Sequence, residues 1–238
     1  MAAVKFPSQS WQISGKDLGA LHRKDFCPRC FWLSRHHKLP WQRFPGIFSS
    51  IDSYTKRLID HHFASTGSPP PWIAGLRDIV GTHPAEGARS FFMIDPVTRI
   101  KLTGAPDVIF KLKDGSLMIA DYKTARLTKN QDELGPTYEV QLNSYREIAH
   151  SLGWPKVTRL ALIYTEPPDK EDPLRLRFHA PEGFQMNFTS KFKEIEIQPK
   201  LTSALLQEAN QIYHQPKPPK ARATCPDCSI LDKIMGSL

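Results

Sequence analysis

The fold is decided by one stretch, which begins at Gly104-Ala-Pro-Asp107, continues through VIFKLKDGSLM and ends at Ile119-Ala-Asp-Tyr-Lys-Thr124. Two β-rich apolar runs flank the turn-forming pair Asp114-Gly115, and this arrangement predicts a hairpin of two antiparallel strands. The segments RSFFMID and RIKLTG, which come just before it, have the same character. We therefore predict an antiparallel meander over residues 88–124.

The two ends of this hairpin carry side chains suited to phosphate chemistry. Because side chains alternate along a strand, Asp121 and Lys123 project to one face, while Tyr122 points away and can anchor the core. A hairpin can place Asp107 beside them. Two carboxylates and the backbone carbonyl of Tyr122 are the oxygen ligands that Mg²⁺ or Mn²⁺ prefers, and Lys123 would then face a scissile phosphate. The alternative is that Asp107 begins a turn and that Asp121 and Lys123 form a surface ion pair.

The segments around the meander predict an α/β fold with a mixed central sheet. Apolar spacing and composition indicate helices at 47–63, 135–152 and about 199–213, a strand at 157–165, and β-like runs at 174–179 and 184–196. The first of these helices has an apolar stripe at Ile47, Ile51, Tyr54 and Leu58. The order strand, helix, strand between 117 and 165 suggests a crossover connection.

This pattern resembles the RecB-like branch of the PD-(D/E)XK nucleases, in which a G-x-x-D strand start precedes an apolar strand ending in D-x-K. A Q-x-x-x-Y motif on the next helix of that family is matched by Gln141 and Tyr145, whose i, i+4 spacing places both on one helical face. The resemblance implies a restriction-endonuclease-like core, with helices flanking the sheet, in which Gln141 and Tyr145 contact substrate or brace the site. Taken alone, Tyr145 is more often a core aromatic and Gln141 a solvated residue.

One element of the family pattern is missing. RecB-like nucleases usually carry a metal-binding His in a G-x-x-x-H pattern on an upstream helix, whereas counting from Gly46 leads to Ser50. Asp52 is the candidate replacement. Glu86 matches a glutamate that is common in the family, although a solvated loop carboxylate is an equally good interpretation.

The only four cysteines form two CxxC pairs near opposite ends of the chain, Cys27/Cys30 and Cys225/Cys228. In a reducing compartment, such pairs more often bind a metal or an iron–sulfur cluster than form disulfides. Four thiolates satisfy either a 4Fe–4S cluster or a tetrahedral structural Zn²⁺. Four unligated thiols are the remaining alternative.

The segment FCPRCFWL around the first pair resembles the C-P-R-x-x-x-L segment of the cluster-bearing nucleases of this branch, including certain CRISPR-associated nucleases and the AddB nuclease domain. In those relatives one N-terminal cysteine joins three C-terminal ones around a 4Fe–4S cluster, whereas this chain divides its four cysteines as two plus two. The resemblance favours iron–sulfur, and the symmetric knuckles favour zinc. In either case we expect a small lobe, formed jointly by 20–45 and 214–238, that joins the two chain ends.

The composition of the chain indicates what kind of partner it binds and how many domains it forms. Lys and Arg number 32 against 24 acidic residues, so the net charge of +8 favours a polyanionic partner such as nucleic acid or an acidic membrane surface. No stretch approaches the roughly 18 apolar residues of a membrane span, and the start of the chain lacks a signal-peptide core. We expect a soluble, cytoplasmic protein that is one nuclease domain over 1–238, with a catalytic core at 86–196.

These observations lead to one functional hypothesis and two rivals. The first is a Mg²⁺- or Mn²⁺-dependent DNA nuclease for single strands or DNA ends, with Asp107 and Asp121 as metal ligands and Lys123 stabilising the attacking water or phosphate; RNA stays open as a substrate. The second, motivated by the missing histidine, is a catalytically weak nucleic-acid-binding subunit of a larger complex. The third is a zinc-stapled scaffold with no nucleic-acid role.

Overall fold

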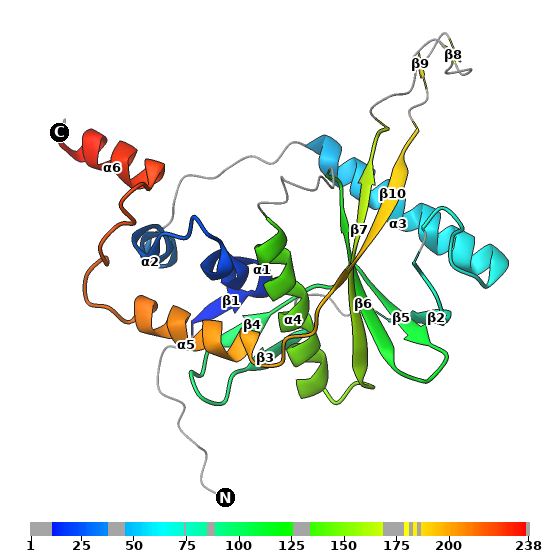
Figure 1. The fold of residues 1–238 in the computed structure, drawn as a ribbon, viewed down its shortest axis with the longest axis horizontal. Coiled ribbons are helices and arrows are strands. Elements are labelled where there is room, and N and C mark those ends of the chain that lie inside the picture. The colour runs from blue at the N-terminus through cyan, green and yellow to red at the C-terminus, as the bar shows by residue number, and fades with distance from the viewer. Residues whose placement is uncertain are drawn as a thin grey trace, which may run out of the picture.

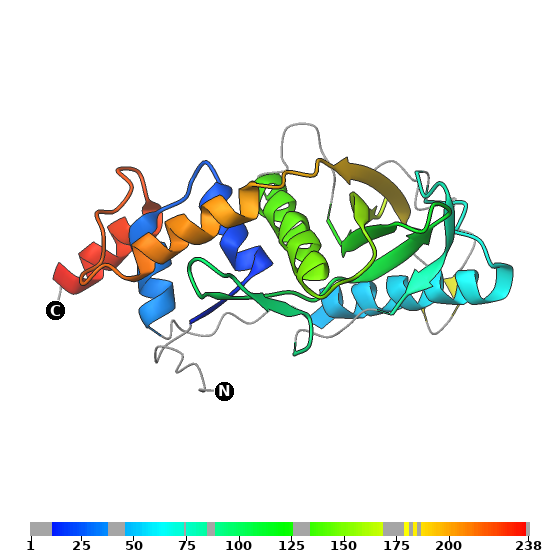
Figure 2. The same cartoon turned by 90° about the horizontal axis from the view of Figure 1, so that it is seen from below.

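The structure is a computed structural model of the 238-residue chain, and it describes residues 11–37, 46–73, 75–84, 89–125, 134–168, 179–180, 183–184 and 187–236. A five-stranded sheet lies toward one end of the long axis, and the segments that carry the cysteines lie toward the other end (Figure 1, Figure 2). A long helix, α4, stands between them.

The central sheet is mixed, as predicted, with the strand order β10-β7-β6-β5-β2. Its strands are β2 (Ile79–His83), β5 (Val108–Leu112), β6 (Leu117–Lys123), β7 (Val157–Glu166) and β10 (Thr189–Ile195). β6 is antiparallel to β5 and parallel to β7, and α4 (Gly135–Ser151) makes the crossover between β6 and β7. The central strands β6 and β7 are buried along nearly their whole length, which explains their almost continuous apolar sequences.

The predicted single meander is wrong, because the chain changes sheets at residues 104–106. β3 (Phe92–Ile94) and β4 (Lys101–Thr103) form a separate three-stranded sheet with β1 (Gln12–Ser14), in the order β1-β4-β3. Pro106 has no N–H for a sheet ladder, and the Gly104 N–H instead donates to the Phe91 carbonyl at 3.0 Å. The hairpin that bears the candidate site, β5 to β6, forms as expected.

Helices cover both faces of the central sheet. α3 (Gly46–Thr66) lies along one face and α4 covers the other, and α5 (Leu201–Tyr213) packs against α4 on the side away from the sheet (Figure 2). Two apolar cores result: one under α3 contains Ile59 and Tyr122, and the other, larger, contains Ile119 and Tyr145. No helix in the described ranges is long and apolar enough to cross a membrane.

The apolar stripe of α3 does not form its buried face. Ile47, Tyr54 and Leu58 are exposed, and the helix instead packs on the sheet through Ile59. The helix itself was predicted correctly, since an apolar period of 3.6 marks a helix whichever way the stripe faces. The exposure of these residues therefore needs a reason other than core formation.

Short helices carry the two cysteine pairs. α1 (Gly15–Leu18) and the 3-10 turn at Gly19–His22 pack along α4, and α2 (Pro28–His36) follows them. α6 (Pro226–Gly236) contains Cys228, and Cys225 immediately precedes it. α2 and α6, which belong to opposite ends of the chain, lie side by side (Figure 1).

Candidate active site and cysteine cluster

The acidic candidate residues meet where β5 begins and β6 ends. Asp107 immediately precedes β5, and its Oδ2 accepts a hydrogen bond from the Tyr122 N–H at 2.9 Å. Asp121 and Lys123 lie on the same face of β6 and form an ion pair, while Tyr122 is buried under α3. The strand alternation inferred from the sequence therefore holds at this site.

Gln141 and Tyr145 on α4 close the opposite side. The Gln141 side-chain N–H donates to Asp121 Oδ1 at 3.2 Å and to the Tyr145 hydroxyl oxygen at 2.7 Å. Its Oε1 accepts from Lys123 Nζ at 3.4 Å. Gly104 must be a glycine here, because a Cβ on it would lie 2.6 Å from the Tyr145 ring. Gly104 of the G-x-x-D motif therefore packs against Tyr145 on one side of the site, and Asp107 of the same motif supplies a carboxylate on the other side.

Lys56 of α3 is part of the site, and the sequence did not single it out. Its Nζ lies 2.8 Å from Asp107 Oδ1 and 2.7 Å from Asp52 Oδ2. A helical Asp–Lys pair at i, i+4 is an ordinary surface pattern, so only the third partner, Asp107, distinguishes it. Ser50, at the position of the missing histidine, donates its hydroxyl to the Gly46 carbonyl within the helix. Glu86 lies outside the described residues.

The electrostatics of the site set Asp121 apart. Asp121 is 3% exposed, and its burial, opposed by the Lys123 ammonium and reinforced by the charge of Asp107, raises the pKa of its carboxyl to about 6. For Lys56, burial acts to lower the pKa, but the bonds to Asp107 and Asp52 outweigh it and the net shift is upward. Lys56 therefore stays an ammonium ion at neutral pH.

The donor set fits a hard divalent cation. Asp121 Oδ2 is buried and, apart from its ion pair with Lys123, accepts no hydrogen bond from a described residue. The Lys123 ammonium balances the charge of this oxygen, which keeps a lone pair for a metal ion. Asp107, Asp121 and the Tyr122 carbonyl offer only oxygen ligands, and Mg²⁺ typically keeps several waters besides a few carboxylates.

The profile of the PD-(D/E)XK nuclease superfamily matches residues 50–232. The chain belongs to that superfamily. Its members are generally nucleases and usually use divalent metal ions. The matched region of this superfamily member contains the whole constellation from Lys56 to Tyr145 and also the second cysteine pair, whereas the first pair, Cys27/Cys30, precedes it.

Other comparisons add little. A solved structure described as "Crystal structure of SSO0001" matches with 12% sequence identity and a TM-score of 0.41, covering 90% of this chain and 82% of that one. A comparison with curated proteins finds no match. The superfamily assignment therefore stands on the profile and on the geometry of the site.

The four cysteines of this superfamily member converge on one point. The Sγ atom of Cys30 lies 3.5 Å from that of Cys225 and 3.4 Å from that of Cys228, and Cys27 Sγ lies 3.7 Å from Cys228 Sγ. All four sulfurs lie within 4.8 Å of one another, and none is in a disulfide. Among the described residues this is the only close group of three or more Cys, His, Asp or Glu ligands. The arrangement suits one metal centre with four thiolate ligands.

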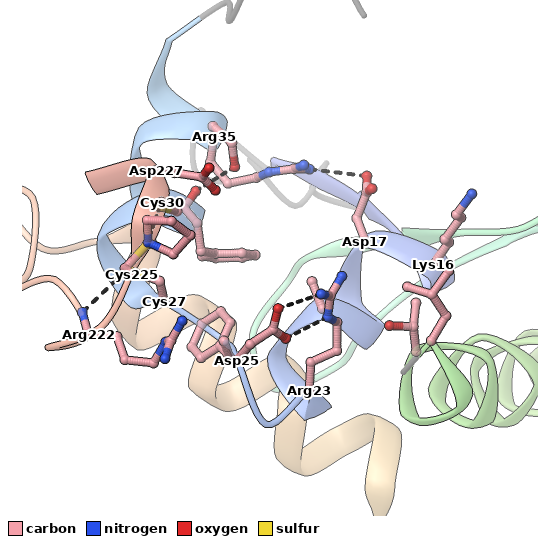
Figure 3. Close-up of a pocket in the computed structure, with 17 residues that line it drawn as sticks. Lys16, Asp17, Arg23, Asp25, Cys27, Cys30, Arg35, Arg222, Cys225 and Asp227 are labelled. Carbon is pink, nitrogen blue, oxygen red and sulfur yellow. Dashed lines mark hydrogen bonds and ion pairs between the residues drawn. The ribbon is translucent and has the colours of Figure 1, made fainter. Parts of the chain in front are cut away.

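Polar contacts brace this cluster and a pocket of about 460 Å³ beside it, which Figure 3 shows. The Arg222 N–H donates to Cys27 Sγ at 3.4 Å. Arg29 forms two bonds with Asp232, at 3.0 and 2.7 Å, that tie α2 to α6. Arg29 is therefore part of the joint between the chain ends.

Proposed function

We propose that this chain is a Mg²⁺- or Mn²⁺-dependent nuclease that hydrolyses phosphodiester bonds in DNA. The observation that carries the proposal is the convergence of Asp107, Asp121 and Lys123 at the strand ends of a PD-(D/E)XK fold, with Gln141 bonded to the second carboxylate. A surface ion pair would not place a nearly fully buried aspartate in such a network.

Each side chain has a distinct role in this proposal. Asp107, Asp121 and the Tyr122 carbonyl would hold the divalent ion, which when bound makes a water nucleophilic near neutral pH and offsets charge on the phosphate. Lys123 supplies a fixed ammonium that stabilises charge developing on the phosphate oxygens. Gln141, held by the Tyr145 hydroxyl, positions both Asp121 and Lys123.

The cysteine centre would serve structure and not catalysis. We place the chain in the RecB-like branch and assign the four thiolates to a 4Fe–4S cluster, with structural Zn²⁺ as the alternative. The centre would bind the lobe made by 20–45 and 214–238 to the catalytic core at 86–196. The sulfurs lie close enough together for either occupant.

DNA is the proposed substrate, as single strands or ends, with RNA as a second possibility. The net charge of +8 supports a polyanionic partner. A second candidate function is a weakly catalytic DNA-binding subunit of a larger complex. It is favoured by Lys56, which lies on the helix where relatives of the RecB-like branch usually carry a metal-binding histidine. The Lys56 ammonium contacts Asp107, one of the proposed metal ligands.

The test compares cleavage of labelled single-stranded DNA, duplex DNA and RNA in Mg²⁺, Mn²⁺ and EDTA. Cleavage in either metal that EDTA abolishes supports the nuclease, and the preferred substrate names its class. Binding of DNA in EDTA with no cleavage in either metal supports the second candidate. Absence of both binding and cleavage contradicts both candidates.

A further inference from the structure

A second pocket, of about 640 Å³, opens between α3 and the ends of β7 and β10. Its walls include Tyr54 of α3, Trp72 from the segment after α3, and Phe188 just before β10. These residues are 62%, 43% and 39% exposed, respectively. Three exposed aromatic residues from separate segments around one hollow make an apolar surface that the folding of the chain does not explain.

The polar groups of this pocket favour an anionic ligand with polar edges. Arg57 lines it and forms no ion pair with a described residue, and no acidic side chain contributes to the lining. Thr165 also lines it and is only 6% exposed, and its buried hydroxyl has no hydrogen-bond partner among the described residues. Buried hydroxyls usually have such a partner, so this one marks an unsatisfied polar group in the wall of the pocket.

The pocket beside the cysteines has a different character. Four basic and three acidic residues contribute to its lining, and Arg23 and Arg35 are paired with Asp25 and Asp17 (Figure 3). Thiolates around a metal would add further negative charge there. A polyanion is therefore better suited to the acid-free pocket against α3.

The acid-free pocket and the candidate active site lie at the same end of the central sheet. Thr55 lines it, and the next residue, Lys56, contacts Asp107. Thr165 follows Tyr164, which is the register partner of Lys123 in the sheet. The pocket lies on the α3 side of the sheet, whereas Asp121 and Lys123 face α4. A nucleic-acid strand that reaches both sites therefore passes around the end of β6 and β7.

We propose that this pocket binds unpaired bases of a single-stranded nucleic acid, which stack on Tyr54, Trp72 and Phe188 while the adjoining phosphate enters the active site. The inference rests on the proposed function and names its substrate class and the path of the strand. Aromatic platforms beside a cationic group are the usual means of holding single strands, because every base has a π-face. Bases already stacked inside a duplex cannot use such a surface.

The experiment measures binding of a short fluorescent oligothymidylate to the full chain in EDTA, so that no cleavage occurs. Tyr54→Ala, Trp72→Ala and Phe188→Ala should each weaken binding about tenfold, the usual effect of losing one stacked base. Trp72→Phe should retain most of the affinity because it keeps a stacking face. Ile234→Ala, an exposed apolar residue on α6 outside the pocket, is the matched control and should bind as the parent does.

An abasic oligonucleotide of the same length provides the second arm. The parent should bind it about as weakly as Trp72→Ala binds oligothymidylate, and the alanine variants should not weaken its binding further. Unchanged oligothymidylate binding in all three variants overturns the proposal and leaves the apolar surface for a protein partner. Equal losses for the abasic strand overturn it as well. Cleavage by the parent is assayed in parallel. If the parent cleaves but the pocket variants bind as the parent does, only this inference is refuted. If the pocket variants lose binding but the parent does not cleave, only the proposed nuclease activity is refuted.

Discussion

Asp121 is a carboxylate whose charge the fold opposes until a cation is bound. Its folded pKa of about 6 exceeds the ordinary 3.8, with burial as the main cause. The folded state therefore binds the proton more tightly than the unfolded state does. The stabilising effect of the protonated form is complete below about pH 4 and is lost as the pH rises from about 4 through 6.

This property yields a prediction for Asp121→Asn in EDTA. Asn resembles the neutral carboxyl, and Lys123 keeps Gln141 as a partner. At pH 7 the variant should therefore have a free energy of unfolding higher than that of the parent by on the order of 2 kcal/mol, and it should melt at a higher temperature. Thermal melts between pH 4 and 8 would show the gap opening as the pH rises. Asp78→Asn, at an exposed carboxylate, is the control. A lower melting temperature for Asp121→Asn at pH 7 would contradict the account.

Lys56 leads to a second prediction at the scale of the residue. Because its ammonium lies 2.8 Å from Asp107 Oδ1, it competes with a metal ion for that oxygen. Lys56→Met should therefore bind Mn²⁺ several-fold more tightly, as measured by calorimetric titration of the protein without DNA. Lys113→Met, which removes an exposed lysine paired with Asp78, should leave the affinity unchanged. A weaker affinity in Lys56→Met would mean that Lys56 supports the metal site.

At the scale of the element, local patterns predicted which segments form strands and helices but not how they combine. The β5–β6 hairpin followed from its turn and its apolar runs, because both are local. The separation of β4 from β5 was missed, since β-propensity does not specify the sheet that a strand joins. The partners of Lys56 were missed for the same reason, as the contact with Asp107 joins segments far apart in the sequence. The exposure of Tyr54 depends likewise on packing that no local period encodes.

Gly104 lies at the junction between the two sheets, and substituting it tests how tightly that junction is packed. A Cβ there meets the Tyr145 ring, which Gln141 holds in place, so Gly104→Ala should destabilise the fold by about 1–3 kcal/mol through overpacking. Gly81→Ala is matched, because nothing lies within 4 Å of the added carbon at that position. Urea unfolding of both variants gives the comparison. Equal stabilities would show that the ring yields freely and does not fix the junction between the sheets.

At the scale of the whole molecule, the cysteine cluster joins the ends of the chain. The use of four rare residues in two pairs predicted their meeting, although the spacing could not name the metal. Soft thiolate ligands and hard carboxylate ligands select different ions, so the two centres should not exchange their metals readily. Closing so long a loop should contribute substantially to stability.

Replacing Cys27 or Cys225 by Ser should therefore remove the bound metal and lower the melting temperature. Anaerobic purification with metal analysis identifies the occupant: iron, sulfide and a broad visible band near 400 nm, roughly where such clusters absorb, indicate 4Fe–4S, whereas one zinc in a colourless protein indicates a structural knuckle. A parent with neither metal, or serine variants with unchanged metal content, would refute a shared centre.

The central claim is that Asp107, Asp121 and Lys123 together form the hydrolytic site, and single-turnover cleavage of single-stranded DNA in Mn²⁺ tests it most directly. Replacing each residue by Ala should slow cleavage at least about a hundredfold, because each change removes a metal ligand or a fixed charge at the phosphate. DNA binding in EDTA should persist in all three variants. Cleavage by Asp121→Ala at the parental rate would contradict the account.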